Sequence, residues 1–322
     1  MREPSGADPT TGRPVPDSLR DPDRTVLVTG GAGFIGSHLA ETLANARPAP
    51  EVRVLDDLST GNRDNVPDNA TFVEGDVRDE EILSTAMEDV DVVFHQSALV
   101  SVEASVDDPR RSHSNNVEGT LAVLEASRSR DTRVIVASSA AIYGEPTEIP
   151  VPESHPKSPK SPYGLEKLTA DRYTRLYHRL YGIETVALRY FNVYGPRQSA
   201  GDYSGVISIF LEQARSGQPI TVHGDGSQTR DFVHVTDVVR ANLLAAHTDT
   251  VGAAVNVGTG TETAVQELAG TISDLTDSGA DIVHTDPRTG DIERSAADLS
   301  KAESALGYRP TVSLENGLTT ML

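Results

Sequence analysis

The sequence predicts an α/β fold in which a doubly wound parallel sheet is followed by a smaller C-terminal α/β domain. Three observations support this prediction: short apolar runs alternate with helical stretches, a glycine-rich turn directly follows the first run, and glycine and proline become frequent after about residue 190. Strands that alternate with helices form parallel sheets covered on both faces. We therefore expect a first domain over residues 25–188 and a second over 189–322, with an approximate and interleaved boundary.

The individual elements follow from local patterns. Residues 1–24 contain five prolines and no apolar periodicity, and are expected to form a flexible leader. Predicted strands are apolar runs at 25–29, 52–55, 71–73, 90–95, 133–137 and 185–189. Predicted helices, which separate them, are at 34–46, 80–87, 117–127 and 162–181.

The composition limits the partners of the chain. A formal net charge of −20 argues against binding to nucleic acid or an anionic membrane, and no apolar run is long enough to span a bilayer. Cysteine is absent, and we predict no metal site. Because 48 acidic residues and only four lysines are spread over the whole chain, we expect a cytoplasmic protein of a halophile. The alternative is an ordinary acidic cytosolic enzyme.

A dinucleotide site is predicted where the first strand ends. Gly30, Gly33 and Gly36 lie between this strand and a helix. Such glycines let the backbone turn tightly and approach a pyrophosphate, which then lies at the helix N-terminus. The second strand ends at Asp56, where a carboxylate accepts hydrogen bonds from the adenosine ribose and repels a 2′-phosphate. The pattern predicts a Rossmann domain that binds NAD rather than NADP; the alternative role of Asp56 is that of a turn residue.

A catalytic centre is predicted at the start of the 162–181 helix, with Ser161 as its N-cap. Tyr163 and Lys167 are four residues apart and project from one helix face. A free phenol has a pKa near 10, and we expect the Lys167 ammonium to lower the pKa of Tyr163 toward that of a useful general base. Ser139 follows a strand and could hydrogen-bond the same substrate hydroxyl as Tyr163. The alternative is a surface tyrosine beside a helical lysine.

These motifs resemble those of the extended short-chain dehydrogenase/reductase family, and within it the UDP-glucose 4-epimerase group. The matching segments are 29–36, 56–61, 75–77, 116–120, 138–144, 163–167, 189–197, 226–235 and 288–291. The resemblance implies an NAD-dependent isomerase that inverts C4 of a UDP-sugar, such as UDP-glucose or UDP-galactose, through a 4-keto intermediate. It assigns catalysis to Ser139, Tyr163 and Lys167.

The resemblance also implies a set of cofactor contacts. Asp76 and Val77 would flank the adenine, and Tyr190 would lie beside the nicotinamide. The full set expected to contact NAD is Gly30, Gly33, Phe34, Ile35, Gly36, Asp56, Asp57, Ser59, Thr60, Gly61, Asp76, Val77, Ser97, Asn116, Tyr163, Lys167 and Tyr190.

A further set of residues is expected to contact the substrate. Arg230 and Arg288 resemble arginines that clamp the diphosphate, because a guanidinium forks onto phosphate oxygens; surface ion pairs are the alternative. Asn192 would contact the diphosphate side and Asp291 the nucleoside ribose. The full set comprises Ser139, Tyr163, Asn192, Arg230, Arg288, Asp291 and Ser295.

Ser295 and Val100 are expected to affect the sugar pocket. By resemblance, Ser295 lies beside the sugar C2 substituent, and its small size would leave room for an N-acetyl group. The alternative is that Ser295 caps a helix beginning near Leu299. Val100 stands where some family members carry a lysine, a departure that could alter contacts to the sugar.

Ala140 and Ala141 separate this chain from sister activities. Sugar-nucleotide 4,6-dehydratases place Asp-Glu at these positions and UDP-glucuronate decarboxylases place a Glu there, whereas alanine exchanges no proton. Three alternatives stay open: a nucleotide-sugar reductase, a UDP-glucuronate epimerase, and a non-catalytic dinucleotide-binding sensor. The resemblance also implies a homodimer through the helices at 117–127 and 162–181, whose apolar residues include Leu121, Leu124, Leu168, Leu176 and Leu180.

Overall fold

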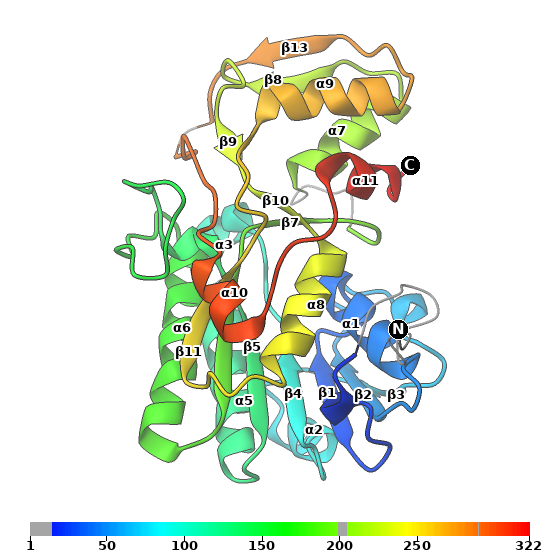
Figure 1. The fold of residues 1–322 in the computed structure, drawn as a ribbon, viewed down its shortest axis with the longest axis vertical. Coiled ribbons are helices and arrows are strands. Elements are labelled where there is room, and N and C mark those ends of the chain that lie inside the picture. Colours follow the sequence, from blue (N-terminus) through cyan, green and yellow to red (C-terminus); the bar gives the residue numbers. More distant parts are fainter. Residues whose placement is uncertain (1–14, 199–204, 289) are drawn as a thin grey trace, which may run out of the picture.

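The computed structural model describes residues 15–198, 205–288 and 290–322. Its main body is built on a seven-stranded sheet, and a smaller lobe with short two-stranded sheets lies above it in Figure 1. No helix in the described ranges is long and apolar enough to cross a membrane. The predicted α/β class with a parallel sheet and a smaller C-terminal part is thus confirmed.

The large sheet is parallel throughout, with the order β11-β6-β5-β4-β1-β2-β3. Its strands are β1 (Thr25–Thr29), β2 (Glu51–Asp56), β3 (Thr71–Glu74), β4 (Val92–His95), β5 (Arg133–Ser139), β6 (Thr185–Tyr190) and β11 (Ala253–Val257). The strand order reverses between β1 and β4, and doubly wound sheets bind ligands at the carboxyl ends of the strands at such a point. This edge is therefore where the predicted site residues should meet.

Helices cover both faces of the sheet, as the alternating side chains of β1 demonstrate. Val26 and Val28 are buried on the face covered by α1, α8 and α10, whereas Leu27 is buried on the face covered by α2, α5 and α6. The bounds are α1 (Phe34–Ala44), α2 (Glu80–Ala86), α5 (Gly119–Arg128), α6 (Pro162–Tyr181), α8 (Val235–Ala245) and α10 (Ser300–Leu306). Burial on both faces explains why the strands are nearly continuous apolar runs.

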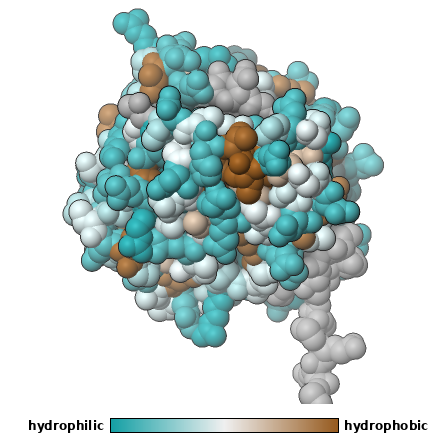
Figure 2. Space-filling view, turned by 90° about the horizontal axis from the view of Figure 1, so that it is seen from above, coloured by the Kyte–Doolittle hydropathy of each residue, from teal (hydrophilic) through white to brown (hydrophobic). Residues whose placement is uncertain are grey.

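The smaller lobe has its own core, which includes Phe210, Val222, Phe232 and Leu268. Its helices are α7 (Val206–Arg215), α9 (Val265–Leu275) and α11 (Leu314–Thr319). Its strands pair as β7 (Asn192–Tyr194) with β10 (Phe232–His234), β8 (Ile220–His223) with β13 (Ile282–Thr285), and β9 (Thr229–Arg230) with β12 (Thr263–Ala264). The face seen from above in Figure 2 is mostly hydrophilic, with hydrophobic residues in small separate groups. The chain crosses between body and lobe repeatedly, because α8, β11 and α10 return to the large sheet.

Residues 15–24 differ from the predicted flexible leader. Val15 and Leu19 are buried in the core that contains α1 and α8, and the Ser18 hydroxyl hydrogen-bonds His247 Nδ1 at 2.9 Å. The prediction is wrong for these ten residues, because isolated apolar side chains among prolines are buried through tertiary contacts. The rest of the predicted leader, residues 1–14, lies outside the described residues.

The predicted helix at 117–127 corresponds to α5, but its first two residues belong to a preceding π-helical turn. Three short segments lead into α5: α3 (Val102–Asp107), α4 (Pro109–His113) and a π-helical turn (Ser114–Glu118). Asn116, a predicted cofactor residue, lies in the π-helical turn. Single π-turns within helices are frequent at functional sites.

Candidate active site

The glycine-rich turn after β1 packs against the loop after β4. Gly30 has a φ of +66°, and a Cβ atom on it would lie 2.6 Å from the Ser97 nitrogen. A Cβ on Gly36 would lie 2.1 Å from the Gly30 carbonyl oxygen. These two positions therefore require glycine, and the predicted residues Gly30, Gly36 and Ser97 meet where the strand order reverses.

Helix α1 begins directly after Gly33, and no side chain caps its N-terminus. The backbone N–H groups at the start of a helix point outward and carry a partial positive charge. The first-turn residues Phe34 and Ile35 thus fit the predicted contact with a pyrophosphate.

Asp56 ties the loop after β2 to the glycine-rich turn. Its carboxylate accepts hydrogen bonds from the backbone nitrogens of Ala32 and Leu58, both at 2.9 Å. A Cβ on Gly61 would lie 2.9 Å from Asp56 Oδ1, so the predicted residue Gly61 approaches the carboxylate closely. Burial raises the pKa of Asp56. The hydrogen bond to Leu58 also makes Asp56 a turn residue, so the turn role proposed as the alternative is present as well.

The remaining residues predicted on the adenosine side lie on the same edge of the sheet. Asp57 accepts hydrogen bonds from the backbone and hydroxyl of Ser59 at 3.0 and 2.6 Å, and Ser59 and Thr60 are exposed. Asp76, after β3, forms an ion pair with Arg78, which lowers the pKa of Asp76. The next side chain, Val77, is buried.

The structure brings Ser139, Tyr163 and Lys167 together at the carboxyl end of β5. The Ser161 hydroxyl accepts a hydrogen bond from the Gly164 nitrogen at 3.1 Å, so Ser161 is the N-cap of α6 as predicted. Tyr163 and Lys167 are then both buried on the face of α6 that packs on the sheet, with 9% and 5% of their surfaces exposed. The Ser139 side chain is near enough to lower the pKa of Tyr163, and Lys167 Nζ donates to the Ala137 carbonyl at 2.9 Å. The alternative of a surface tyrosine beside a helical lysine is therefore wrong.

The electrostatics of the pair differ from the expectation that Lys167 lowers the pKa of Tyr163 below its usual value. Burial raises the pKa of Tyr163, and the hydrogen bond from Ser139 works in the opposite direction. Burial also lowers the pKa of Lys167 to about 8, while the nearby charge of Glu166 works against that shift. Burial is the larger influence on both groups because charged forms lose their hydration there.

Tyr190, the predicted nicotinamide contact, is held by two residues that were not predicted from the sequence. Its hydroxyl hydrogen-bonds Gln96 at 3.3 Å and Asn242 at 3.0 Å, and burial raises the pKa of Tyr190 to about 12. Gln96 directly follows β4, and this position at the carboxyl end of a strand could have identified it as a candidate site residue. Asn242 comes from α8, 52 residues away from Tyr190, and no local pattern could have identified it.

Apart from Ser139 and Tyr163, the predicted substrate residues lie in the smaller lobe and its connections. Arg230 forms an ion pair with Asp291, so two predicted ligands of the substrate contact one another. Arg288 and Asn192 are exposed. Ser295 is buried, and α10 begins only at Ser300 with Leu299 as N-cap and no capping side chain. Ser295 therefore does not cap that helix, and the alternative role is wrong.

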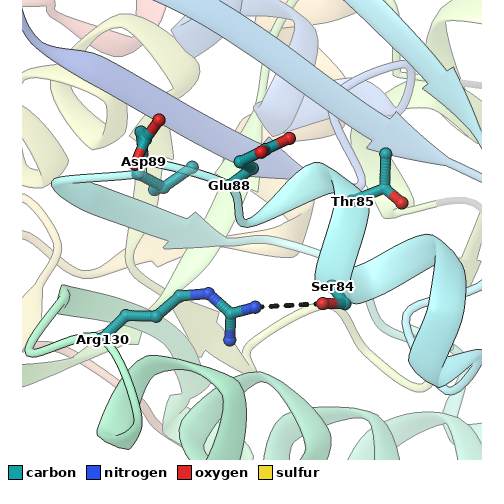
Figure 3. A pocket seen from close by; sticks show the side chains of 6 residues that line it. Ser84, Thr85, Glu88, Asp89 and Arg130 are labelled. Atoms are coloured by element: carbon teal, nitrogen blue, oxygen red, sulfur yellow. Dashed lines mark hydrogen bonds between the residues drawn. The ribbon is translucent and has the colours of Figure 1, made fainter.

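A hollow of about 520 Å³ lies at the opposite, amino-terminal edge of the sheet (Figure 3). It is lined by Ser84, Thr85, Glu88, Asp89, Val90 and Arg130. Arg130 already donates to the Ser84 hydroxyl at 3.0 Å, and the other charges are carboxylates that would repel phosphates. This hollow is not suited to a dinucleotide, and the chemistry points to the carboxyl edge.

Comparisons with known proteins identify the family of this chain. The model of the "NAD dependent epimerase/dehydratase family" matches residues 26–258. A protein of Methanocaldococcus jannaschii, provisionally named UDP-glucose 4-epimerase, is 45% identical over 91% of this chain and 95% of its own. The UDP-glucose 4-epimerase of Thermotoga maritima, solved with UDP-glucose, is 40% identical with a TM-score of 0.88, covering 92% of this chain and 96% of its own.

A second solved structure comes from a differently named epimerase. The UDP-N-acetylglucosamine 4-epimerase of Methanobrevibacter ruminantium, solved with UDP-N-acetylmuramic acid, is 36% identical with a TM-score of 0.89, over 93% of this chain and 97% of its own. The predicted cofactor, NAD, is confirmed by the family match. This chain belongs to the NAD-dependent epimerase/dehydratase family and is an enzyme resembling the UDP-glucose 4-epimerases.

Proposed function

We propose that this enzyme inverts C4 of a UDP-sugar and interconverts UDP-glucose and UDP-galactose through a 4-keto intermediate. The observation that carries the proposal is the set of side chains around Ser139. Tyr163 and Lys167 supply one proton-transfer group and one cation, while Ala140 and Ala141 supply no further acid or base. Elimination of water needs an additional acid or base, whereas epimerisation does not.

NAD, when bound, accepts the hydride from sugar C4 and returns it to the opposite face. We propose that the first turn of α1 and Gly33 hold its pyrophosphate and that Asp56 accepts hydrogen bonds from its adenosine ribose. Asp57, Ser59, Thr60, Gly61, Asp76 and Val77 would surround the adenosine, while Ser97, Asn116 and Tyr190 would surround the nicotinamide side. The uncapped helix start and the close approach at Gly30 and Gly36 support this assignment.

Tyr163 is proposed to take the proton of the C4 hydroxyl during oxidation and to return it during reduction. The Ser139 hydroxyl, which is near Tyr163, would hydrogen-bond the same substrate oxygen. Because burial raises the pKa of Tyr163, its phenolate needs a nearby positive charge, and the Lys167 ammonium is on the same helix face. General acid–base catalysis of this kind contributes about 10²–10⁴-fold.

The smaller lobe is proposed to hold the nucleotide part of the substrate. Arg230 and Arg288 would bind the diphosphate, with Asn192 beside it, and Asp291 would bind the ribose. Since Asp291 already holds Arg230, substrate binding would have to rearrange this ion pair. Ser295 would leave room for an N-acetyl group at C2, and the similarity to the M. ruminantium N-acetylglucosamine epimerase supports this broader substrate range.

We further propose that the enzyme is a homodimer through α5 and α6. Leu124 and Leu168 are buried within the fold, but Leu165 and Leu180 of α6 are 56% and 59% exposed, as are Val102 and Val106 of the adjoining α3 at 52% and 60%. A second copy would cover these side chains. Static light scattering should give twice the mass of the chain; a monomer mass would exclude the dimer.

The experiment that tests the function uses the purified enzyme, UDP-galactose and no added NAD. We expect UDP-glucose to form until the two sugars reach equilibrium, and extraction should release bound NAD. A reaction that requires added NAD(P)H and yields a reduced sugar would instead establish a reductase. Bound dinucleotide without conversion of any UDP-sugar would support the sensor.

A further inference from the structure

Two carboxylates are buried on the face of α6 that carries Tyr163 and Lys167. They differ in whether an arginine is paired with them. Asp171 is paired with Arg189 at 2.8 Å and Arg175 at 2.7 Å. Glu166 is 4% exposed, yet no ion pair in the described ranges includes it. Burying a carboxylate without a cation is costly, so a position of this kind suggests a functional role.

Neutral hydrogen-bond donors hold Glu166 in place. Its Oε2 accepts from the Ser112 hydroxyl at 2.6 Å and from Asn116 Nδ2 at 2.7 Å. Asn116 in turn accepts from the Leu99 nitrogen at 2.8 Å and donates to the Leu99 carbonyl at 3.1 Å. Leu99 lies just after Ser97, at the carboxyl end of β4. Glu166 is therefore connected through Asn116 to the loop that packs against Gly30.

Glu166 lies three residues after Tyr163, on the same face of α6, and is buried next to Lys167 in the chain. It raises the pKa of Lys167, against the effect of burial, and it also raises the pKa of Tyr163. From β4, His95 faces Lys167, but burial, with the Lys167 charge, lowers its pKa to about 3, so it is neutral at working pH. The charged or titratable side chains of the adjoining helices α3 and α4 are exposed: Glu103, Asp107, Arg110, Arg111 and His113.

We propose that Glu166 is a positioning residue of the active site, which keeps Lys167 in its ammonium form and holds the Leu99 loop through Asn116. The proposal deepens the proposed function and rests on it for the role of Lys167. Sequence reasoning could have found Glu166, because a residue three after Tyr163 lies on the same helix face.

The direct test is the titration of Lys167 in protein labelled with carbon-13 lysine. Only four lysines are present, and Lys167→Arg identifies the signal of interest. In Glu166→Gln, which keeps the side-chain oxygen and removes the charge, the pKa of Lys167 should fall by about one unit or more. The control is Glu118→Gln, an exposed glutamate that also accepts from a serine, Ser114, and it should leave the Lys167 titration unchanged.

The rate of epimerisation against pH provides a second readout. In the wild type, activity should fall as pH rises through the Lys167 pKa, because the ammonium is lost. Without the Glu166 charge, the pKa values of Lys167 and Tyr163 should both be lower. The alkaline limb, where the Lys167 ammonium is lost, and the acid limb, where Tyr163 is protonated, should therefore both move to lower pH by about one unit. A merely structural role would lower the rate without moving the limbs.

Glu166→Asp is the second variant, used also if Glu166→Gln does not fold. It keeps the charge but withdraws it from Ser112 and Asn116, so we expect the Lys167 pKa to stay near that of the wild type while kcat falls. A Lys167 titration that is the same in Glu166→Gln as in the wild type would overturn the proposal, as would unchanged kcat in Glu166→Asp. Wild-type protein that titrates as expected but converts no UDP-sugar would instead refute the proposed function and leave the effect of Glu166 on Lys167 standing.

Discussion

The carboxyl edge of the large sheet and the smaller lobe differ in how the side chains proposed to act on the substrate are held. At the sheet edge, Asp56, Tyr163 and Lys167 are at most 9% exposed, and Asp56 and Lys167 hydrogen-bond backbone groups of the fold. In the lobe, Arg288 is exposed and Arg230 is held by a half-exposed Asp291. If these residues act as proposed, the catalytic geometry exists before the substrate binds, whereas the contacts to the nucleotide rearrange. Changes at the sheet edge should therefore alter kcat or cofactor content, and changes in the lobe should alter KM.

The largest effect is expected from Tyr163→Phe. Loss of the phenolic oxygen should lower kcat by about 10²–10⁴-fold, because proton transfer at the C4 hydroxyl is lost. Bound NAD, measured after extraction, should be unchanged. Tyr181→Phe, at an exposed position on the same helix, is the control and should keep full activity. A Tyr163→Phe rate within a few-fold of wild type would refute the catalytic assignment.

Arg230→Ala tests the lobe side of the comparison. Loss of a charged hydrogen bond to phosphate costs about 1.5–3 kcal/mol, so KM for the UDP-sugar should rise roughly ten- to one-hundred-fold with kcat much less affected. Arg309→Ala removes an arginine from an exposed ion pair and should change neither constant. A lower kcat at unchanged KM in Arg230→Ala would contradict the assignment of substrate binding to the lobe and of catalysis to the sheet edge.

Ser295→Tyr addresses the choice of sugar. A tyrosine at this buried position should exclude an N-acetyl group by overlap, a penalty larger than the roughly 1–3 kcal/mol of one methylene. Activity on UDP-N-acetylglucosamine should disappear while activity on UDP-glucose largely persists. Ser295→Ala stays small and should keep both activities. Rejection of both N-acetyl sugars by the wild type would place the selective residue elsewhere.

Two glycine substitutions should change the stability of the protein in opposite directions. A Cβ on Gly36 would lie 2.1 Å from the Gly30 carbonyl oxygen, so Gly36→Ala should destabilise the protein by about 1–3 kcal/mol and reduce bound NAD. Gly270 lies in α9 of the lobe, where a Cβ would meet no other part of the described chain within 4 Å, and Gly270→Ala should stabilise the helix by roughly 0.5–1 kcal/mol. Thermal melts and NAD extraction measure both. Equal stability of the two variants would contradict the close packing of the glycine-rich turn after β1.

The elements of the large sheet could be predicted because their sequence patterns are local. Helix α6 spans the predicted residues, with Ser161 as cap, and β1 matches the predicted run. The strand predicted from Val90 begins at Val92 instead, and the Asp91 carboxylate just before it accepts from the Thr25 nitrogen at 2.9 Å. Burial of Leu19 could not be predicted, since it depends on a tertiary core rather than on periodicity.

The site was predictable where residues stand at strand or helix ends. Ser139 and Asp56 end strands, and parallel strands place such ends on one edge. The ion pair between Arg230 and Asp291 joins residues 61 apart in the sequence, with α8, α9 and several strands between them, and no local pattern indicates it. The roles of the lobe residues came from family resemblance alone.

The central claim is that C4 is oxidised and then reduced within one site, and deuterium at that carbon tests it most directly. UDP-galactose labelled with deuterium at C4 should give UDP-glucose with the label still at C4, because the same hydride is returned. The reaction should be run without added NAD and the product examined by mass spectrometry and NMR. Loss of the label to solvent, or its appearance in released NADH, would contradict the account.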